Sequence, residues 1–315
     1  MALDLLNLLF FPAGLGLIAA GLLYQWADRK LLARFQNRVG PRWFQPFADA
    51  LKLLGKEEIY PAGSSRFLFA ALPILALAGS LTAALYVPLF GLAPVFGFPG
   101  DLIVTLYLMS LLTLCIGLAG AQTRDRFSLA GALRVFTQMF AYEAPFILAL
   151  LSPAVALMLA GQPSSWQIGE LATAAAGQPW FLLTLPITFV VALIGLMGKL
   201  ELPPFDAPEA ETEIVAGALT EYSGRGLALF TLARAVELVV GLTLVAALYL
   251  GGVGSEPLAA VAFTAKTIGL LLVVVVLQTL LARLRIDQTV NLWWRLGSVL
   301  VLAQWLLLLV FRVLR

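Results

Sequence analysis

The long apolar runs of this chain constrain its fold more than any other feature. Eight stretches are apolar over about 20 residues, the length that a helix needs to cross the hydrocarbon core of a bilayer. They cover roughly residues 3–26, 67–90, 101–121, 132–160, 179–198, 227–250, 259–281 and 293–313. Only 12% of the residues are charged, against about 25% in soluble domains. Because lipid offers no partners for free backbone groups, we predict an all-α integral membrane protein, with one transmembrane domain over residues 1–315.

The loops between these spans alternate between loops that contain Lys or Arg and loops that contain neither. Basic loops next to short spans normally stay in the cytoplasm. The basic loops are residues 27–66, 122–131, 199–226 and 282–292. The alternation therefore predicts a multi-pass protein whose two termini both face away from the cytoplasm.

The first cytoplasmic loop contains an amphipathic segment. Phe44, Phe47, Ala48, Leu51 and Leu54 recur at helical spacing. This pattern predicts a short amphipathic helix that lies at the membrane interface. Two roles stay open: simple anchoring, or one wall of a cavity entered from the membrane plane.

The loop 199–226 is unusually acidic for a cytoplasmic loop beside a bilayer. It holds six of the chain's 18 carboxylates: Glu201, Asp206, Glu209, Glu211, Glu213 and Glu221. Carboxylates that lie close together raise one another's pKa, so such a group can take up and release protons. Pro203, Pro204 and Pro208 favour a fixed, irregular segment over the alternative, a solvated acidic loop.

Several ionisable side chains fall inside the predicted spans, where each costs about 2.5–3.5 kcal/mol to insert at the helix centre. Glu143 lies near the middle of the fourth span beside Pro145, which predicts a kinked helix and a proton or ion site; a structural hydrogen bond is the alternative. Arg234 and Glu237 are three residues apart and can pair along one helix face. Lys266 has no partner in its own helix, so it either faces a neighbouring subunit or extends to the interface.

Three cytoplasmic segments resemble those of one known family. They are residues 28–41 (DRKLLARFQNRVGP), residues 204–213 (PFDAPEAETE) followed by EYSG at 221–224, and residues 282–288 (ARLRIDQ). They resemble subunit 1 of respiratory complex I (NADH-quinone oxidoreductase), which is called the H subunit in bacteria. The resemblance extends over almost the whole chain.

The resemblance implies a subunit at the heel of a redox-driven proton or sodium pump. Such a subunit docks the peripheral redox arm, forms much of a quinone chamber and couples redox chemistry to ion translocation. The coupling carboxylates that the resemblance implies are Glu143, Glu201, Asp206, Glu209, Glu211 and Glu213, and we add Glu221, Arg234, Glu237 and Lys266 as candidate coupling residues. The resemblance implies that Arg29, Arg34 and Arg38 line the chamber mouth or dock the peripheral arm, and we add Gln36, Asp49, Lys52 and Arg134 as candidates for the same role.

Cofactors are expected in partner subunits and not in this chain. It has no histidine and a single cysteine, Cys115, so it cannot hold an iron–sulfur cluster alone. We expect no metal site here, with quinone as the candidate small molecule. The implied partners are peripheral-arm iron–sulfur and hydrogenase-like subunits, antiporter-like and small membrane subunits, and the lipid bilayer of a prokaryotic cytoplasmic membrane. A net charge of +2 does not point to nucleic acid.

The first loop departs from most complex I members. Gly40-Pro41 runs almost directly into Trp43, without the repeated Asn-Arg-Val-Gly-Pro insertion, and so resembles the homologous subunit of energy-converting [NiFe] hydrogenases. That alternative stays open. A stand-alone transporter is disfavoured because the sequence shows no internal repeat. We expect the chain to be inactive without its partners.

Overall fold

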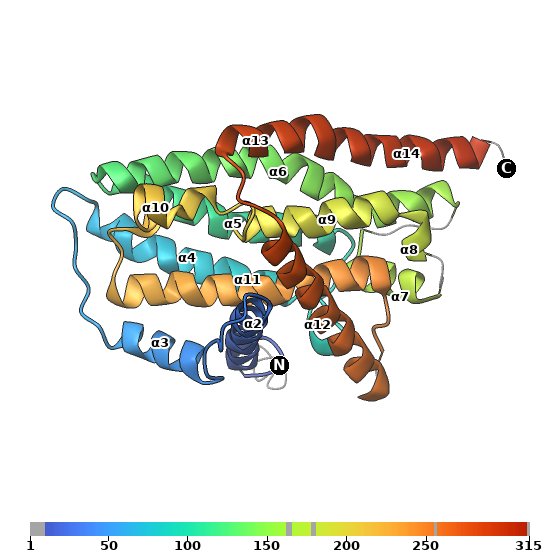
Figure 1. Cartoon of the computed structure of the whole chain (residues 1–315). Helices are drawn as coiled ribbons and strands as arrows, with labels where there is room; N and C mark the ends of the chain where they lie inside the picture. The colour runs from blue at the N-terminus through green and yellow to red at the C-terminus, as the bar shows by residue number, and fades with distance from the viewer. Residues whose placement is uncertain (1–9, 162–165, 178–180, 255–256, 314–315) are drawn as a thin grey trace.

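The computed structural model describes residues 10–161, 166–177, 181–254 and 257–313, apart from the side chains of Glu211 and Val313. Within these ranges every regular element is a helix, and the long helices form one elongated bundle (Figure 1). The long elements are α2 (Gly14–Phe35), α4 (Arg66–Ala84), α5 (Asp101–Gln122), α6 (Arg126–Leu159), α9 (Pro186–Lys199), α11 (Gly224–Leu250), α12 (Pro257–Leu280) and the continuous series α13 (Ile286–Asn291), η4 (Leu292–Gly297, a π-helix) and α14 (Ser298–Val313). The short elements are α3 (Gln45–Leu54), η1 (Leu89–Gly91), α7 (Ile168–Gly177), α8 (Phe181–Thr184), η2 (Ala207–Glu209), α10 (Glu211–Ile214) and η3 (Gly217–Leu219).

Six of the described helices are long and apolar enough to cross a membrane. They comprise α4 with η1, α5, α6, α11, α12 and the α13–α14 series. α9 has 14 residues, about 21 Å of helix, which is shorter than a bilayer core. α2 has 22 residues, but its last two turns carry Asp28, Arg29, Lys30 and Arg34. The all-α membrane class is therefore confirmed, whereas the predicted count of eight spans is not.

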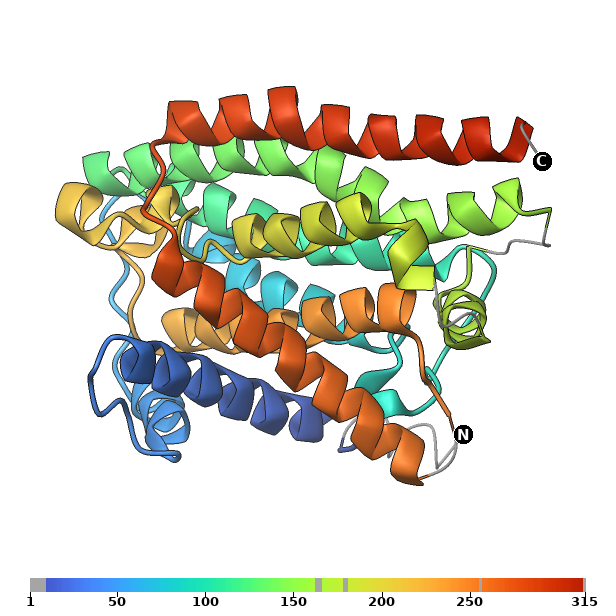
Figure 2. The same cartoon turned by 45° about the vertical axis from the view of Figure 1, so that its right-hand side comes forward.

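α11 occupies the centre of the bundle. It packs against α2, α4, α7 and α12, and 83% of the residues in its most apolar stretch are buried. Small residues permit the close approach, as in other membrane bundles. A Cβ on Gly21 of α2 would lie 2.7 Å from the Ala235 carbonyl oxygen, so only glycine fits at this crossing. Figure 2 shows α12 crossing the bundle beside α2, while α14 runs along α6 on the outside.

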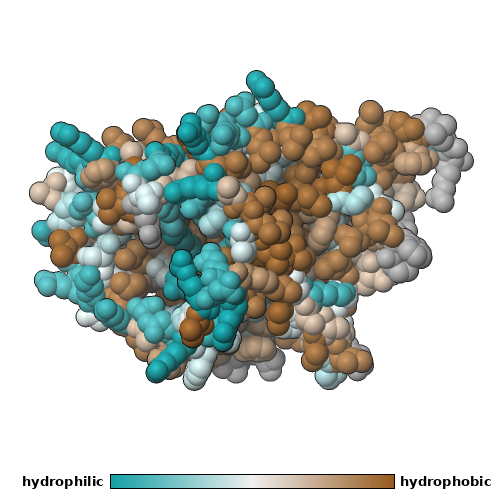
Figure 3. Space-filling view, in the orientation of Figure 1, coloured by the Kyte–Doolittle hydropathy of each residue, from teal (hydrophilic) through white to brown (hydrophobic). Residues whose placement is uncertain are grey.

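The predicted amphipathic helix is confirmed as α3. It packs against α2 and α11 through Pro46 and Ala50, while Leu51 is 69% exposed. Figure 3 shows hydrophilic side chains gathered at the end of the molecule that holds α3 and α10, and hydrophobic side chains over the remainder of this face. The acidic loop therefore lies at the polar end of an otherwise apolar molecule.

Candidate functional site

The acidic loop is folded against the bundle and is not a solvated excursion. Gln138 of α6 donates hydrogen bonds from Nε2 to the carbonyl oxygens of Gly198 (3.0 Å) and Phe205 (2.7 Å). Gly131 of α6 lets the loop approach closely, because a Cβ there would lie 2.3 Å from the Ala218 nitrogen. These contacts hold the loop at a fixed position on α6.

Two neighbouring groups of ion pairs link this loop and the end of α9 to the central helix α11. Arg234 of α11 contacts Glu209 and, at 2.8 Å, Glu201. Lys199, the last residue of α9, lies 3.6 Å from Glu237 of α11. The Lys199 and Glu237 side chains are only 2% and 1% exposed. We call these five residues, Lys199, Glu201, Glu209, Arg234 and Glu237, the buried ion-pair chain.

The buried ion-pair chain contains more acidic groups than basic groups. Three carboxylates face two cations, so with all five groups ionised one negative charge is unbalanced. Glu201 Oε1 is buried and accepts no hydrogen bond from the described residues. Burial is the main cause that raises the pKa of Glu201 to about 7, against an opposing effect of Arg234. Glu201, at the end of the buried ion-pair chain nearest the acidic loop, can therefore hold or release one proton near neutral pH.

A small cavity lies beside these groups. Its volume is about 10 Å³, and it is lined by Thr113, Lys199, Glu201 and Arg234 together with three apolar side chains. Such a volume is close to the minimum for one water molecule, which needs two or more polar partners. A water here would lie beside Lys199, Glu201 and Arg234.

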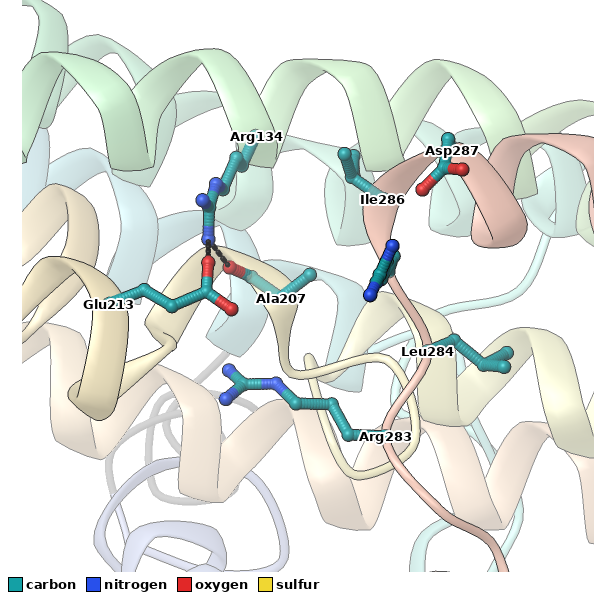
Figure 4. A pocket seen from close by; sticks show the side chains of 8 residues that line it. Arg134, Ala207, Glu213, Arg283, Leu284, Ile286 and Asp287 are labelled. Atoms are coloured by element: carbon teal, nitrogen blue, oxygen red, sulfur yellow. Dashed lines mark hydrogen bonds and ion pairs between the residues drawn. The ribbon is translucent and has the colours of Figure 1, made fainter.

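Two further ion pairs tie the acidic loop to its surroundings (Figure 4). Arg134 of α6 lies 2.6 Å from Glu213 and donates to the Ala207 carbonyl oxygen at 3.2 Å. Arg283, between α12 and α13, lies 3.0 Å from Asp206. The hydrogen bond from Arg134 lowers the pKa of Glu213. Between these pairs opens a larger cavity of about 340 Å³.

Two predicted charge assignments are corrected by the structure. Arg234 and Glu237 share a helix but take different partners, because the acidic loop and α9 supply nearer charges. Lys266 donates to the carbonyl oxygens of Leu250 and Gly251, both at 2.9 Å. It therefore caps the end of α11, where helix carbonyls lack partners, and it lies apart from the buried ion-pair chain.

Glu143 does not join the buried ion-pair chain either. α6 continues as a single helix through Pro145 from Arg126 to Leu159, and a kink at this proline stays a prediction. Glu143 is half-buried, and within the described residues it makes no ion pair or hydrogen bond. Its coupling role stays a prediction, as does that of the half-buried Glu221. The side chain of Glu211 lies outside the described residues.

The predicted chamber or docking residues separate into two groups. Arg29 and Asp49 face each other at 4.0 Å where α2 meets α3. The other first-loop members are exposed around the same two helices: Arg34, Gln36, Arg38 and Lys52. Arg134 instead lines the larger cavity beside the acidic loop.

Sequence reasoning misses the importance of Lys199 and Tyr142. A lysine at the end of an apolar run is usually expected to extend toward water. In the structure Lys199 is buried, 6.0 Å above the Tyr142 ring. The Tyr142 hydroxyl lies 3.4 Å from Thr113, which lines the small cavity. Nothing in the local sequence pairs residues so far apart.

The raised pKa of Glu201 predicts a pH-dependent stability. A carboxyl group with a folded-state pKa of about 7 favours the folded state below its unfolded pKa near 4.5, and this contribution is lost as the pH rises through 7. We expect Glu201→Gln to flatten the decline in thermal stability between pH 5 and pH 8, an effect of at most about 3 kcal/mol. Thermal unfolding of the purified complex at several pH values measures this. Parallel curves for the wild type and the variant would contradict it.

Known proteins resemble this chain in sequence and in fold. The family model described as NADH dehydrogenase matches residues 7–309. The H subunit of NADH-quinone oxidoreductase from Thermomicrobium roseum is 35% identical over 293 residues, which cover 86% of this chain and 85% of that protein. Among solved structures, a chain of the membrane-bound sulfane sulfur reductase, an archaeal respiratory membrane complex, superposes with a TM-score of 0.81 at 22% identity. That match covers 97% of this chain and 98% of the other, and it shows a shared fold.

Proposed function

The chain belongs to the NADH dehydrogenase family that includes the H subunit of NADH-quinone oxidoreductase, and from this premise we propose that it couples redox chemistry in partner subunits to ion translocation across the membrane. It is a multi-pass membrane subunit of a complex-I-type assembly. The observation that supports the coupling role is the buried ion-pair chain. It joins a cytoplasmic loop to the central helix and contains one more carboxylate than cations.

Arg234 is the pivot of the proposed mechanism. It is shared between Glu209, on the loop, and Glu201, at the inner side. When a redox event in a partner displaces the loop or protonates Glu209, Arg234 pairs with Glu201 alone. That favours the charged form of Glu201, and the proton that it releases passes to the carboxylate of Glu237, beside Lys199. Reversal of the loop movement restores the higher pKa of Glu201 and takes up the next proton.

The polar end of the molecule is the proposed docking surface. The basic first loop and α3 are exposed there, beside the folded acidic loop. A peripheral arm with iron–sulfur subunits would cover this end, and antiporter-like subunits would lie beside the apolar faces. In this proposal the membrane is the cytoplasmic membrane of a prokaryote, both termini lie outside, and quinone enters near Arg29, Arg38 and Asp49.

A hydrogenase-type complex is the second candidate. Only residues 36–44 separate the end of α2 from the start of α3, and this short connection supports it. In that branch a [NiFe] centre in a partner replaces quinone as the redox reactant. The coupling role is the same in both candidates.

The test uses the whole complex, purified in mild detergent through a tag on this chain and reconstituted into liposomes. We expect inhibitor-sensitive quinone reduction accompanied by ion transport, without nickel. Hydrogen evolution from a low-potential donor, with bound nickel, would support the second candidate instead. Ion transport by the isolated chain, at the rate of the complex, would contradict both and indicate a stand-alone transporter.

A further inference from the structure

Three arginines converge on the larger cavity beside the acidic loop. Arg134 comes from α6, and Arg283 and Arg285 come from the connector between α12 and α13. Arg134 and Arg283 are paired with Glu213 and Asp206, but within the described part of the chain Arg285 makes no ion pair. All three guanidinium groups lower the pKa of Glu213, and the lining holds three arginines against two carboxylates, Glu213 and Asp287.

The cavity lies beside the ends of apolar helices, where lipid headgroups are expected. The connector that carries Arg283 and Arg285 joins two membrane spans, one ending at Leu280 and the next beginning at Ile286. Arg134 is about 12 Å into α6, and the remaining 25 residues, about 37 Å, are enough to cross the hydrocarbon core. In Figure 1 α13 begins near the middle of the molecule, where Figure 3 shows hydrophilic surface giving way to hydrophobic surface.

Apolar side chains adjoin the charged ones. Leu284 and Ile286 line the cavity itself, and in Figure 4 Ile286 lies between Arg134 and Asp287. Outside it, Leu280 is 74% exposed and Trp294 is 55% exposed. Tryptophan is typical of the membrane interface, so a headgroup in the cavity would have its acyl chains against existing apolar surface.

We propose that this cavity binds the phosphate of an anionic phospholipid, with Arg285 as the main phosphate ligand and the exposed apolar residues of α12 and η4 against the acyl chains. Basic pockets between transmembrane helices at the cytoplasmic surface are suited to such headgroups. Arginine suits phosphate because its planar fork donates two parallel hydrogen bonds. The bound lipid would pack against the connector whose Arg283 holds Asp206 of the acidic loop. Lipid binding would therefore stabilise the loop in the position described here.

A soluble partner protein is a less suitable occupant on these observations. In the proposed assembly a peripheral arm covers the polar end, whereas the connector that lines the cavity is flanked in sequence by the exposed apolar residues Leu280 and Trp294. A partner's carboxylate could satisfy Arg285, but it would leave these apolar side chains uncovered. Occupancy by a partner protein is therefore an outcome that the experiment must distinguish.

The experiment counts lipids bound to the purified complex by native mass spectrometry. Delipidated complex is titrated with phosphatidylglycerol or with phosphatidylcholine. We expect saturable phosphatidylglycerol binding that Arg285→Gln weakens by about tenfold, since a hydrogen bond to a charged group is among the strongest. The matched control is Arg126→Gln, because Arg126 is an exposed arginine at the start of α6 that does not line the cavity. Equal binding by the wild type and Arg285→Gln would overturn the proposal.

Two further arms separate the sources of the anion. Inorganic phosphate is added as a competitor, and displacement of phosphatidylglycerol at millimolar concentration would indicate a free-anion site and overturn the lipid assignment. A photoreactive amino acid at position 284 of the assembled complex should crosslink to phosphatidylglycerol. A crosslink to a partner subunit would overturn it. Bound lipid is the readout throughout, so failure here is distinguishable from failure of the coupling role.

Discussion

Glu201→Gln is expected to reduce redox-driven ion transport by about a hundredfold, the lower end of what a positioned proton-transfer group contributes. The substitution keeps the size of the side chain but removes its ability to hold a proton. Arg234 keeps Glu209 as a partner, so the acidic loop stays anchored to α11. The measurements are the rate of redox-driven ion transport and the number of ions transported per electron pair, in liposomes that contain the complex.

The matched control for this experiment is Glu57→Gln. Glu57 is an exposed carboxylate at the same polar end of the molecule, and it has no part in the buried ion-pair chain. Transport by this variant should equal that of the wild type. Normal ion-to-electron ratios in the Glu201→Gln complex would show that Glu201 carries no coupled proton.

Lys199→Met is expected to destabilise the folded subunit by about 3–5 kcal/mol, because it leaves a buried carboxylate without its partner. Lys199 and Glu237 are almost fully enclosed, so water cannot replace the lost ion pair. Thermal unfolding of the detergent-purified complex measures the loss. An unchanged unfolding midpoint would mean that Glu237 is neutral in the wild-type protein.

The double variant Lys199→Met with Glu237→Leu separates stability from function. Replacing both members of a buried ion pair by apolar residues of similar volume is often neutral or stabilising. We expect this variant to recover most of the lost stability while ion transport stays uncoupled. Recovery of both would show that the pair is structural only.

Local sequence patterns were sufficient for features that depend on neighbouring residues. The apolar runs predicted helices because a chain in lipid must satisfy its own backbone hydrogen bonds. The spacing from Phe44 to Leu54 predicted α3 almost to the residue. The acidic loop also marked the candidate site, since Glu201 and Glu209 do belong to the buried ion-pair chain.

The partners of each charge depend on the tertiary structure. Arg234 and Glu237 are near enough in sequence to pair, yet each takes a partner from the region of residues 199–209. Lys266 caps α11 because the end of that helix comes beside α12. Pro145 lies within α6, and the helix is nevertheless continuous from Arg126 to Leu159.

Periodicity, hydropathy and motifs are properties of short stretches, so the membrane class, the position of the amphipathic helix and the family could be read from the amino-acid sequence. The folded arrangement of the helices sets which carboxylates are buried, which cations they contact and where a cavity lies. Burial and Coulomb energy depend on distance in space and not on distance along the sequence. Segments separated by many residues meet here only after α6, α9 and α11 have packed together.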